Sequence, residues 1–421
     1  MSYIIVGNSA AGLFAVEEIR RHDTKSELIV LTAEQEPSYS RCLTTYFLAG
    51  DIPASHLYLR DTDFANRLNL KVVYGVEVNG IDSERQIVQS MDGRKWVYSK
   101  LLLAMGASAN KLSIPGRELP EVFTLRTMND ALGIDKILEQ GAKKAIIIGG
   151  GLVSLKSAYA LRKRGLDVTV LVSSDQIFSQ MLTAKAASLL QKHLEANVLS
   201  FLLQTEAIAI IGEEHVQGVL IAPDLELTAD LVIVGKGVHP NIELIRDCGF
   251  NIGQGLQVDS FLATNLPNIY AAGDIAETWD LVRQKFALNA TWPNATTQGR
   301  IAGANMCGRQ EVYPGSLGLN SVDFFGLSAM SVGVAKLQEN GDQGDWYQEE
   351  NLKMIRNLPV YRNLVWQGDI LKGFILVGDT SQVGVLTALV KSGRPLTQVQ
   401  KNLAIGKRGT LAVGLLNRNS G

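Results

Sequence analysis

Two short glycine-rich turns, each between an apolar strand-like run and a helix-like run, constrain this chain of 421 residues more than any other feature. In the first pattern an apolar run at residues 3–6 leads into a turn at residues 7–12, and a helical run follows. The second repeats this order at residues 145–148 and 149–154. Such a turn lets the backbone approach a pyrophosphate, and the helix that follows directs N–H groups and its positive dipole end at the anion. The patterns therefore predict two Rossmann-type units, which would hold two dinucleotides; a flavin and a nicotinamide are the obvious pair.

The bulk composition fits an ordinary globular protein of two or three domains, with 46% apolar and 19% charged residues. A net charge of −2 gives no reason to expect nucleic-acid binding. No apolar run is long enough for a membrane helix, and the first strand begins at Tyr3, which leaves no room for a signal peptide. We therefore expect a cytoplasmic protein. The wide separation of Cys42, Cys248 and Cys307 argues against a disulfide framework and a metal site.

The order of these motifs resembles the two-dinucleotide flavoproteins, also called pyridine nucleotide–disulfide oxidoreductases, over about residues 1–320. Residues 101–107 resemble the strand that crosses between domains in that family, and residues 231–241 resemble the exit from its second unit. The most specific motif is at residues 264–274, where Asp274 would contact the ribitol of FAD. The resemblance implies an α/β fold with two Rossmann-like, doubly wound domains, the second inserted in the first, and a C-terminal α+β domain.

Three domains follow from this resemblance. They are an FAD-binding domain (residues 1–113 and 245–319), an NAD(P)-binding domain (residues 114–244) and a C-terminal interface or partner-docking domain (residues 320–421). In the last of these, residues 320–326 and 370–379 have the pattern of strands, and a helix is expected at residues 383–392.

For FAD, the resemblance implies a set of contact residues drawn from several motifs. They are Gly7, Ser9, Ala11, Gly12, Glu34, Arg41, Val78, Ala104, Gly106, Arg126, Gly273, Asp274 and Trp292. Glu34 is the nearest carboxylate after the second strand and would bind the adenosine ribose; a solvated loop acid is the alternative. Arg126 would approach the flavin phosphates, which suits a guanidinium with its fixed fork of donors; a surface arginine is the alternative. Trp292 lies in a segment that would cup the pyrimidine end of the flavin.

The second site would hold NAD(P)H at Gly149, Gly151, Ser154 and Gly237. A carboxylate at the end of its second strand would select the 2′-hydroxyl of NAD, and an arginine would accept the 2′-phosphate of NADP. Neither follows the strand at residues 168–171, where the chain continues Val172-Ser173-Ser174. The lack of a basic residue in this loop favours NAD without excluding NADP.

The segment at residues 37–46 indicates the subclass. It contains one cysteine, Cys42, so two-cysteine disulfide chemistry is not expected. The run Tyr39-Ser40-Arg41 resembles the rubredoxin reductases and the flavin domains of nitrite reductases. We interpret Cys42 as a small packing residue beside the flavin, with a redox role as the alternative.

A charge exchange is also implied by the comparison with rubredoxin reductases. Lys156 stands where those proteins have a Glu, and Tyr46 stands where they have a Lys. The hypothesis is that Lys156 and Tyr46 border the isoalloxazine and that the ammonium favours the anionic reduced flavin. The alternative for Lys156 is a solvated helix lysine.

The function implied is an FAD-dependent NAD(P)H oxidoreductase that exchanges electrons with an iron–sulfur protein, a rubredoxin, or another subunit, for example of an aldehyde oxidoreductase complex. A homo- or hetero-oligomer would fit. One alternative is a Cys42-dependent NADH oxidase, peroxidase or CoA-disulfide reductase, and another is a redox-sensing FAD protein without catalytic turnover. After Asp379 the chain has no acidic residue, which suits docking of an acidic partner or a solvated basic tail equally. The basic residues there are Lys391, Arg394, Lys401, Lys407, Arg408 and Arg418.

Overall fold

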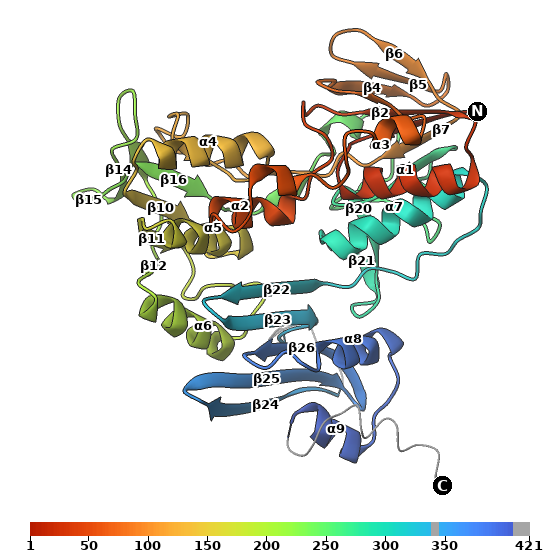
Figure 1. Ribbon diagram of the computed structural model, residues 1–421. Coiled ribbons are helices and arrows are strands. Elements are labelled where there is room, and N and C mark those ends of the chain that lie inside the picture. Colours follow the sequence, from red (N-terminus) through yellow and green to blue (C-terminus); the bar gives the residue numbers. More distant parts are fainter. Residues whose placement is uncertain (338–344, 407–421) are drawn as a thin grey trace. The chain divides into compact units, whose positions relative to one another are not determined.

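The computed structural model describes residues 1–337 and 345–406 and is drawn in Figure 1. The chain forms two compact units. Unit 1 consists of Met1–Phe47, Ile52–Ala109 and Val238–Ser316, and unit 2 of Leu48–Asp51, Asn110–Gly237 and the chain from Leu317 onward. Each unit contains a five-stranded parallel sheet, so the predicted pair of Rossmann-like domains is confirmed. The boundaries expected for three separate domains stay a prediction, since unit 2 also includes the C-terminal sheet.

The central sheet of unit 1 has the strand order β19-β7-β1-β2-β3, and all its pairings are parallel. Its strands are β1 (Ser2–Val6), β2 (Glu27–Leu31), β3 (Lys71–Val73), β7 (Lys100–Leu103) and β19 (Ile269–Ala271). The apolar runs of β1, β2 and β7 are buried, as expected for a parallel sheet covered on both faces. The strand order reverses between β1 and β7, and in such sheets a ligand binds outside the carboxyl ends of the strands at this switch point.

Two long helices of unit 1, α1 (Ala10–His22) and α7 (Trp292–Met306), lie side by side in Figure 1. Their backbones approach closely, because a Cβ added to Gly299 would lie 2.2 Å from the carbonyl oxygen of Ala11, and one added to Gly303 would lie 2.7 Å from that of Ala15. Since both contacts advance by four residues in the same sense, the helices run in the same direction. Their N-termini therefore point the same way, and α7 begins seven residues before the level of Ala11.

The remaining elements of unit 1 are short. Small sheets are formed by β4 (Val78–Asp82), β5 (Ile87–Ser90) and β6 (Lys95–Val97), by β18 (Leu256–Gln257), β20 (Ala276–Asp280) and β21 (Lys285–Ala287), and by β8 (Ala107–Ala109) with β17 (Val238–Pro240). Short helices are η1 (Arg41–Leu43), α2 (Thr44–Leu48, which ends in unit 2), η2 (Ala54–Leu57), α3 (Phe64–Arg67) and η3 (Glu243–Ile245). The antiparallel pair β8–β17 lies where the chain leaves unit 1 and returns to it.

The parallel sheet of unit 2 has the order β12-β11-β10-β16-β9. Its strands are β9 (Val122–Phe123), β10 (Lys144–Ile148), β11 (Asp167–Val172), β12 (Ser200–Leu203) and β16 (Leu231–Val234). Its helices are α4 (Met128–Glu139), α5 (Leu152–Lys163) and α6 (Ala184–Ala196), and an antiparallel sheet is formed by β13 (Ala209–Ile211), β14 (Gly218–Ala222) and β15 (Leu225–Thr228). The order reverses between β10 and β16, so a second switch point is present.

The C-terminal part of unit 2 is an antiparallel sheet of order β22-β23-β26-β25-β24 with two helices. Its elements are β22 (Leu319–Phe324), β23 (Leu327–Gly333), β24 (Trp346–Ile355), β25 (Leu358–Gln367), β26 (Ile370–Val377), α8 (Val383–Ser392) and α9 (Gln398–Ala404). The α+β expectation for this region is confirmed, as are the strands expected near residues 320 and 370 and the helix that follows.

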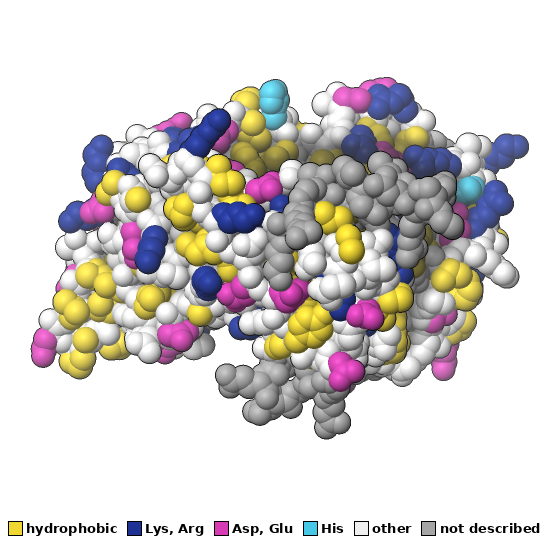
Figure 2. Space-filling model, turned by 90° about the horizontal axis from the view of Figure 1, so that it is seen from below, with side chains coloured by type: hydrophobic (Ala, Val, Ile, Leu, Met, Phe, Trp, Pro, Cys, Tyr) yellow, Lys and Arg dark blue, Asp and Glu magenta, His cyan; other side chains and the backbone are white. Residues whose placement is uncertain are grey.

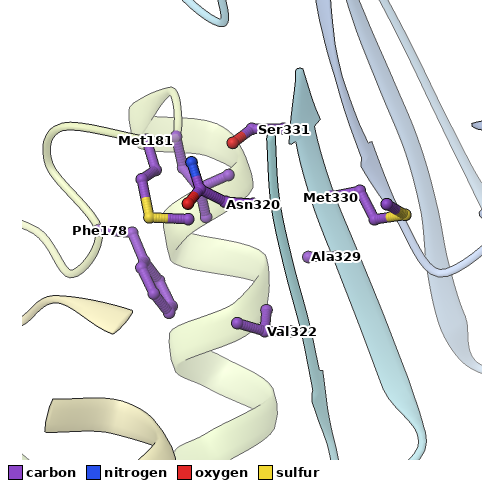
Figure 3. Close-up of a pocket in the computed structure, with 8 residues that line it drawn as sticks. Phe178, Met181, Asn320, Val322, Ala329, Met330 and Ser331 are labelled. Atoms are coloured by element: carbon purple, nitrogen blue, oxygen red, sulfur yellow. The ribbon is translucent and has the colours of Figure 1, made fainter. Parts of the chain in front are cut away.

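This sheet packs on the nucleotide-binding part of the same unit. His193 Nε2 donates to the carbonyl oxygen of Phe324 across 3.1 Å, and the Tyr159 and Phe325 rings meet edge to face with centroids 4.7 Å apart. In Figure 3, Phe178 and Met181 face β22 and β23 across a small apolar hollow. The hollow has no room for a water molecule, so it is a packing contact and carries no ligand.

Candidate functional site

The first glycine turn brings α1 close to the carboxyl end of β1. Gly7 has a φ of +114°, and a Cβ there would lie 2.1 Å from the carbonyl oxygen of Ala104, which directly follows β7. A Cβ on Gly12 would lie 1.9 Å from the carbonyl oxygen of Gly7. Only glycine fits either position, because the atoms it would displace belong to the backbone. Ser9 is the N-cap of α1, so the unpaired N–H groups of the first turn begin at the predicted pyrophosphate site.

The return motif lies between the start of α1 and the middle of α7. Gly273, with a φ of +84°, follows β19, and a Cβ there would lie 3.1 Å from the Cβ of Ala11. The backbone N–H of Gly273 donates to the side-chain oxygen of Gln298 on α7 at 2.8 Å, which ties the return motif to that helix. Asp274 is the next residue and is partly buried. The structure thus brings together the first glycine turn, the return motif and α7, which are widely separated in the sequence.

The start of α7 carries a polar atom that fits a bound group. Thr291 is the N-cap of α7, and Trp292 is its first residue. The hydroxyl oxygen of Thr291 is buried without a hydrogen-bond partner among the described residues. A buried hydroxyl is normally paired, so an orphaned one at a helix N-terminus suits a polar ligand atom. Together with the glycine cradle of α1, this fits FAD bound along the edge of the first sheet.

The predicted ribose ligand Glu34 belongs to a cluster beyond the end of β2. The Tyr39 hydroxyl donates to the Glu34 carboxylate at 2.6 Å, and the Arg41 guanidinium forms an ion pair with the same carboxylate and donates to the Tyr39 oxygen at 2.9 Å. Glu34 and Arg41 were expected as separate FAD contacts, and the structure shows them paired. A carboxylate has about four acceptor positions, so Glu34 can still accept a ribose hydroxyl.

The other residues predicted to contact FAD lie as follows. Val78 is the first residue of β4, and Gly106 lies between β7 and β8 with its carbonyl oxygen accepting from the Asn241 N–H at 3.0 Å. Arg126 lies in unit 2, directly before the capping box of α4, and its backbone N–H donates to Asp130 at 2.6 Å. The role of Arg126 toward the flavin phosphates stays a prediction.

Cys42 lies on η1 and is exposed, while Tyr46 lies on α2 and is 44% exposed. The other cysteines lie elsewhere in unit 1. Cys248 follows η3, and Cys307 is the C-cap of α7, where burial raises the pKa of its thiol. The three cysteines, all in the described part of the chain, form no disulfide. The interpretation of Cys42 as a packing residue beside the flavin stays a prediction.

The second glycine turn forms a similar cradle in unit 2. Gly149 has a φ of +124°, and a Cβ there would lie 2.4 Å from the carbonyl oxygen of Gly235. Gly151 is the N-cap of α5, and a Cβ added to it would meet no described atom within 4 Å. Gly149 thus makes the tight turn, whereas Gly151 leaves the helix N-terminus open. This difference suits a pyrophosphate that approaches Gly151. Gly237, with a φ of +85°, lies in the short connection between β16 and β17.

Ser154 is fully buried, and its hydroxyl donates to the carbonyl oxygen of Gly235 at 3.2 Å. The side chain thus fastens α5 to the end of β16. Its predicted contact with the nucleotide stays a prediction. Lys156, two residues further along α5, is partly exposed, and the hypothesis that Lys156 and Tyr46 border the isoalloxazine stays a prediction.

The sequence motifs did not indicate Lys236 as a neighbour of the loop after β11. This lysine follows β16, yet its ammonium donates to the Ser173 hydroxyl at 3.3 Å. In the sheet, β10 lies between β16 and β11, and only this strand order brings the two residues together. No local pattern could have indicated it.

The basic C-terminal residues are not all exposed. Lys391 and Arg394 are exposed, but Lys401 is 6% exposed and its ammonium contacts Asp369 and the Tyr347 hydroxyl, each at 2.7 Å. Lys401 is therefore removed from the predicted docking face. Lys407, Arg408 and Arg418 lie outside the described residues. On the face shown in Figure 2, basic and acidic side chains are interspersed.

No helix in the described part of the chain is both long and apolar enough to cross a membrane.

Curated proteins of several activities are similar to this chain. It is 32% identical to an NADH oxidase of Methanocaldococcus jannaschii over 80% of this chain and 78% of that protein. It is 32% identical to a rubredoxin–NAD(+) reductase of Pseudomonas putida over 75% of this chain and 82% of that protein. It is 29% identical to the epsilon subunit of an NADH-dependent phenylglyoxylate dehydrogenase of Aromatoleum evansii over 96% of both chains. The chain spans only about half the length of the Bacillus subtilis nitrate reductase electron transfer subunit and nitrite reductase that it also resembles.

Among solved structures, an NAD-dependent persulfide reductase from A. fulgidus superposes with a TM-score of 0.89 at 27% identity, over 97% of this chain and 80% of that one. Residues 1–299 match the model of the pyridine nucleotide-disulphide oxidoreductases. Both nucleotide cradles described above fall within that match. The chain therefore belongs to the pyridine nucleotide-disulphide oxidoreductase family, as its motifs predict, and is an FAD-dependent oxidoreductase that uses NAD(H).

Proposed function

We propose that this protein is an electron-transfer reductase that passes electrons between a nicotinamide nucleotide and a separate one-electron carrier, either an iron–sulfur protein, a rubredoxin or a partner subunit. The observation that carries the proposal is the combination of two nucleotide cradles with a single cysteine, Cys42, on the segment after Arg41. A dithiol relay needs two thiols within bonding distance, and the described cysteines do not supply them. A dithiol relay is therefore not expected here, which favours an electron acceptor outside this segment.

The residues of unit 1 would hold the flavin dinucleotide by charge and shape. The N-termini of α1 and α7 present unpaired N–H groups and positive dipole ends, which favour the pyrophosphate and a flavin carbonyl oxygen. Asp274 would accept hydrogen bonds from the ribitol, and Glu34 from the adenosine ribose. When bound, FAD accepts a hydride from the nicotinamide and can release electrons one at a time.

In unit 2, the open N-terminus of α5 at Gly151 would bind the nicotinamide nucleotide. The tight Gly149 turn and the Ser154 hydrogen bond hold α5 against β16. This framework would hold the pyrophosphate in one place and so orient the nucleotide for hydride transfer.

The partner class is supported by the relatives. One is named a rubredoxin–NAD(+) reductase, and another of nearly equal length is a subunit of a larger dehydrogenase. Exposed Lys391 and Arg394, at the end of α8 and after it, offer positive charge to an acidic carrier. The proposal includes a cytoplasmic location and assembly into a homo- or hetero-oligomer.

A second function is favoured by one observation, the exposure of Cys42. An exposed thiol beside the FAD cradle suits a single-cysteine NADH oxidase, peroxidase or CoA-disulfide reductase, and the similarity to an NADH oxidase is in line with it. In that reaction Cys42 itself would receive the electrons.

The deciding experiment is anaerobic stopped-flow reduction of the purified holoprotein by NADH and by NADPH, followed by addition of acceptors. We expect rapid bleaching of the flavin, slow reoxidation by oxygen, and fast reoxidation by a rubredoxin or a small iron–sulfur protein. Fast turnover with oxygen, peroxide or CoA disulfide alone would contradict the proposal and support the single-cysteine enzyme.

A further inference from the structure

We propose that Lys236 forms a binding site for the 2′-phosphate of NADPH, so that this protein accepts NADPH and not only NADH. This inference rests on the nicotinamide site of the proposed function. It differs from the expectation drawn from the loop after β11, whose residues include no basic side chain.

The position of the ammonium carries the argument. The backbone of Lys236 lies beside the Gly149 turn, because the preceding residue, Gly235, contacts Gly149. The side chain of Lys236 reaches Ser173, the first residue after β11. The end of the second strand in a Rossmann unit is where the adenosine ribose lies and where a carboxylate or a basic residue reads its 2′ position. Lys236 therefore places a positive charge at that position from a different strand.

No acidic side chain takes the usual NAD-selecting position. Val172 is the last residue of β11 and is 1% exposed, so an apolar side chain fills that place. The hydroxyl of Ser174 donates to the carbonyl oxygen of Gln176 at 2.8 Å and so stabilises the turn after β11. Ser173 and Lys236 are left as a hydroxyl and an ammonium facing the same point. Both can donate to a phosphate.

The backbone of Lys236 is held on both sides. The Asn110 side-chain amide donates to the carbonyl oxygen of Lys236 at 3.0 Å, and the Asn110 N–H donates to that of Gly237, also at 3.0 Å. Gly235, on the other side, contacts the buried hydroxyl of Ser154. The backbone position from which the lysine side chain extends is therefore set by the fold.

Glu206 is the competitor for this ammonium. Its carboxylate lies 3.7 Å from the Lys236 nitrogen, and its side chain is 72% exposed against 29% for Lys236. A long, exposed ion pair contributes little, so a dianionic phosphate can displace Glu206. The same carboxylate would repel the phosphate weakly if it stayed in place. Removing Glu206 should therefore strengthen binding of a 2′-phosphate.

The test compares two probes that differ only in the 2′-phosphate, 5′-AMP and adenosine 2′,5′-bisphosphate, by calorimetric titration of the holoprotein. We expect wild type to bind the bisphosphate more tightly than 5′-AMP. Lys236→Met should weaken the bisphosphate about tenfold or more, as for loss of a charge-assisted hydrogen bond, and leave 5′-AMP within about twofold. Glu206→Gln should strengthen the bisphosphate alone. Lys185→Met, which removes another lysine with an exposed ion-pair partner in unit 2, is the matched control and should change neither.

Two results would overturn the inference. Equal weakening of both probes in Lys236→Met would place the ammonium on the part they share, and no change in either would leave Lys236 as a surface ion pair only. Absence of binding by both probes and by NADH in wild type would refute the nicotinamide site itself. That outcome contradicts the proposed function and is distinct from the first two, in which wild type still binds a probe.

Discussion

The hydroxyl of Ser154 on α5 donates a hydrogen bond to the carbonyl oxygen of Gly235 after β16, across 3.2 Å, in the interior of unit 2. At the corresponding position of the first turn, Gly12 lies directly against the carbonyl oxygen of Gly7. The two cradles therefore fasten the helix to the sheet differently. The first does so by close backbone approach, and the second by a side-chain hydrogen bond to a neighbouring strand.

Gly235→Ala tests this contact. The added Cβ would lie 2.0 Å from the Ser154 oxygen, so we expect a destabilisation of about 1–3 kcal/mol and weaker NADH binding. In a Ser154→Gly background the nearest remaining contact of that Cβ to residue 154 is its backbone nitrogen at 3.2 Å, and the same substitution should cost at least about 1 kcal/mol less. Thermal unfolding of the four proteins in this cycle checks the coupling; strictly additive effects would contradict it.

Gly149→Ala and Gly151→Ala should separate folding from binding. Gly149 has a φ of +124° and a carbonyl oxygen 2.4 Å from an added Cβ, so its substitution should lower the melting temperature. Gly151 has open space around an added Cβ, so its substitution should leave the melting temperature nearly unchanged but weaken NADH binding about tenfold or more, because the methyl group occupies the pyrophosphate position. Melting curves and NADH titrations measure the two effects. Normal NADH affinity in Gly151→Ala would show that the pyrophosphate lies elsewhere.

Cys42→Ser distinguishes the two candidate functions. If electrons leave to a separate carrier, we expect NADH-dependent reduction of rubredoxin or of an iron–sulfur protein to stay within about twofold of wild type, since serine preserves the size of the side chain. If Cys42 is a redox centre, turnover with oxygen, peroxide or CoA disulfide should fall by at least about a hundredfold. Cys248→Ser, at a partly exposed cysteine that follows η3, serves as the control.

His215 and Glu121 form a pH-dependent ion pair in unit 2. His215 Nδ1 lies 2.7 Å from the Glu121 carboxylate, which also accepts from the Val216 N–H at 2.9 Å. This hydrogen bond raises the pKa of His215 above 6.5. Burial alone would raise the pKa of Glu121, but the Val216 N–H and His215 outweigh it, and the pKa lies below 4.5.

The directions of the two pKa shifts define the pH range in which this ion pair stabilises the fold. The contribution of His215 to the free energy of unfolding is complete below pH 6.5 and is lost as the pH rises through its higher folded pKa. The contribution of Glu121 is complete above pH 4.5 and is lost as the pH falls through its lower folded pKa. The pair is therefore strongest between those values. An NMR titration should give His215 a pKa above 6.5 in wild type and a lower one in Glu121→Gln. An unchanged value in Glu121→Gln would mean that the pair does not form.

Lys156→Met tests the predicted position of this lysine beside the flavin. Loss of a positive charge near the flavin should make the two-electron midpoint potential more negative by about 30 mV or more and slow reduction by NADH. Lys163→Met, on the same helix and ion-paired with Asp51, should leave the potential unchanged. A spectroelectrochemical titration measures both variants, and an unaltered potential in Lys156→Met would identify a solvated helix lysine.

The local features of the two nucleotide-binding units could be predicted from the sequence. The glycine turns, α1 and α5 with the strands before them, and the strands β22 and β26 lie within a few residues of where the sequence pattern places them. These elements are specified by neighbours in the chain, through apolar periodicity and through glycine where the backbone requires it. The family and its cofactors follow from the same motifs in a fixed order.

The tertiary structure alone decided which distant residues meet. Strand order brings Lys236 to Ser173 across β10, and helix packing turns the Ser154 hydroxyl toward Gly235. Burial likewise removes Lys401 from the basic surface that its neighbours in the sequence suggest. Periodicity and motifs report only on residues close in the chain, whereas these contacts join segments up to about 80 residues apart and depend on how sheets and helices pack.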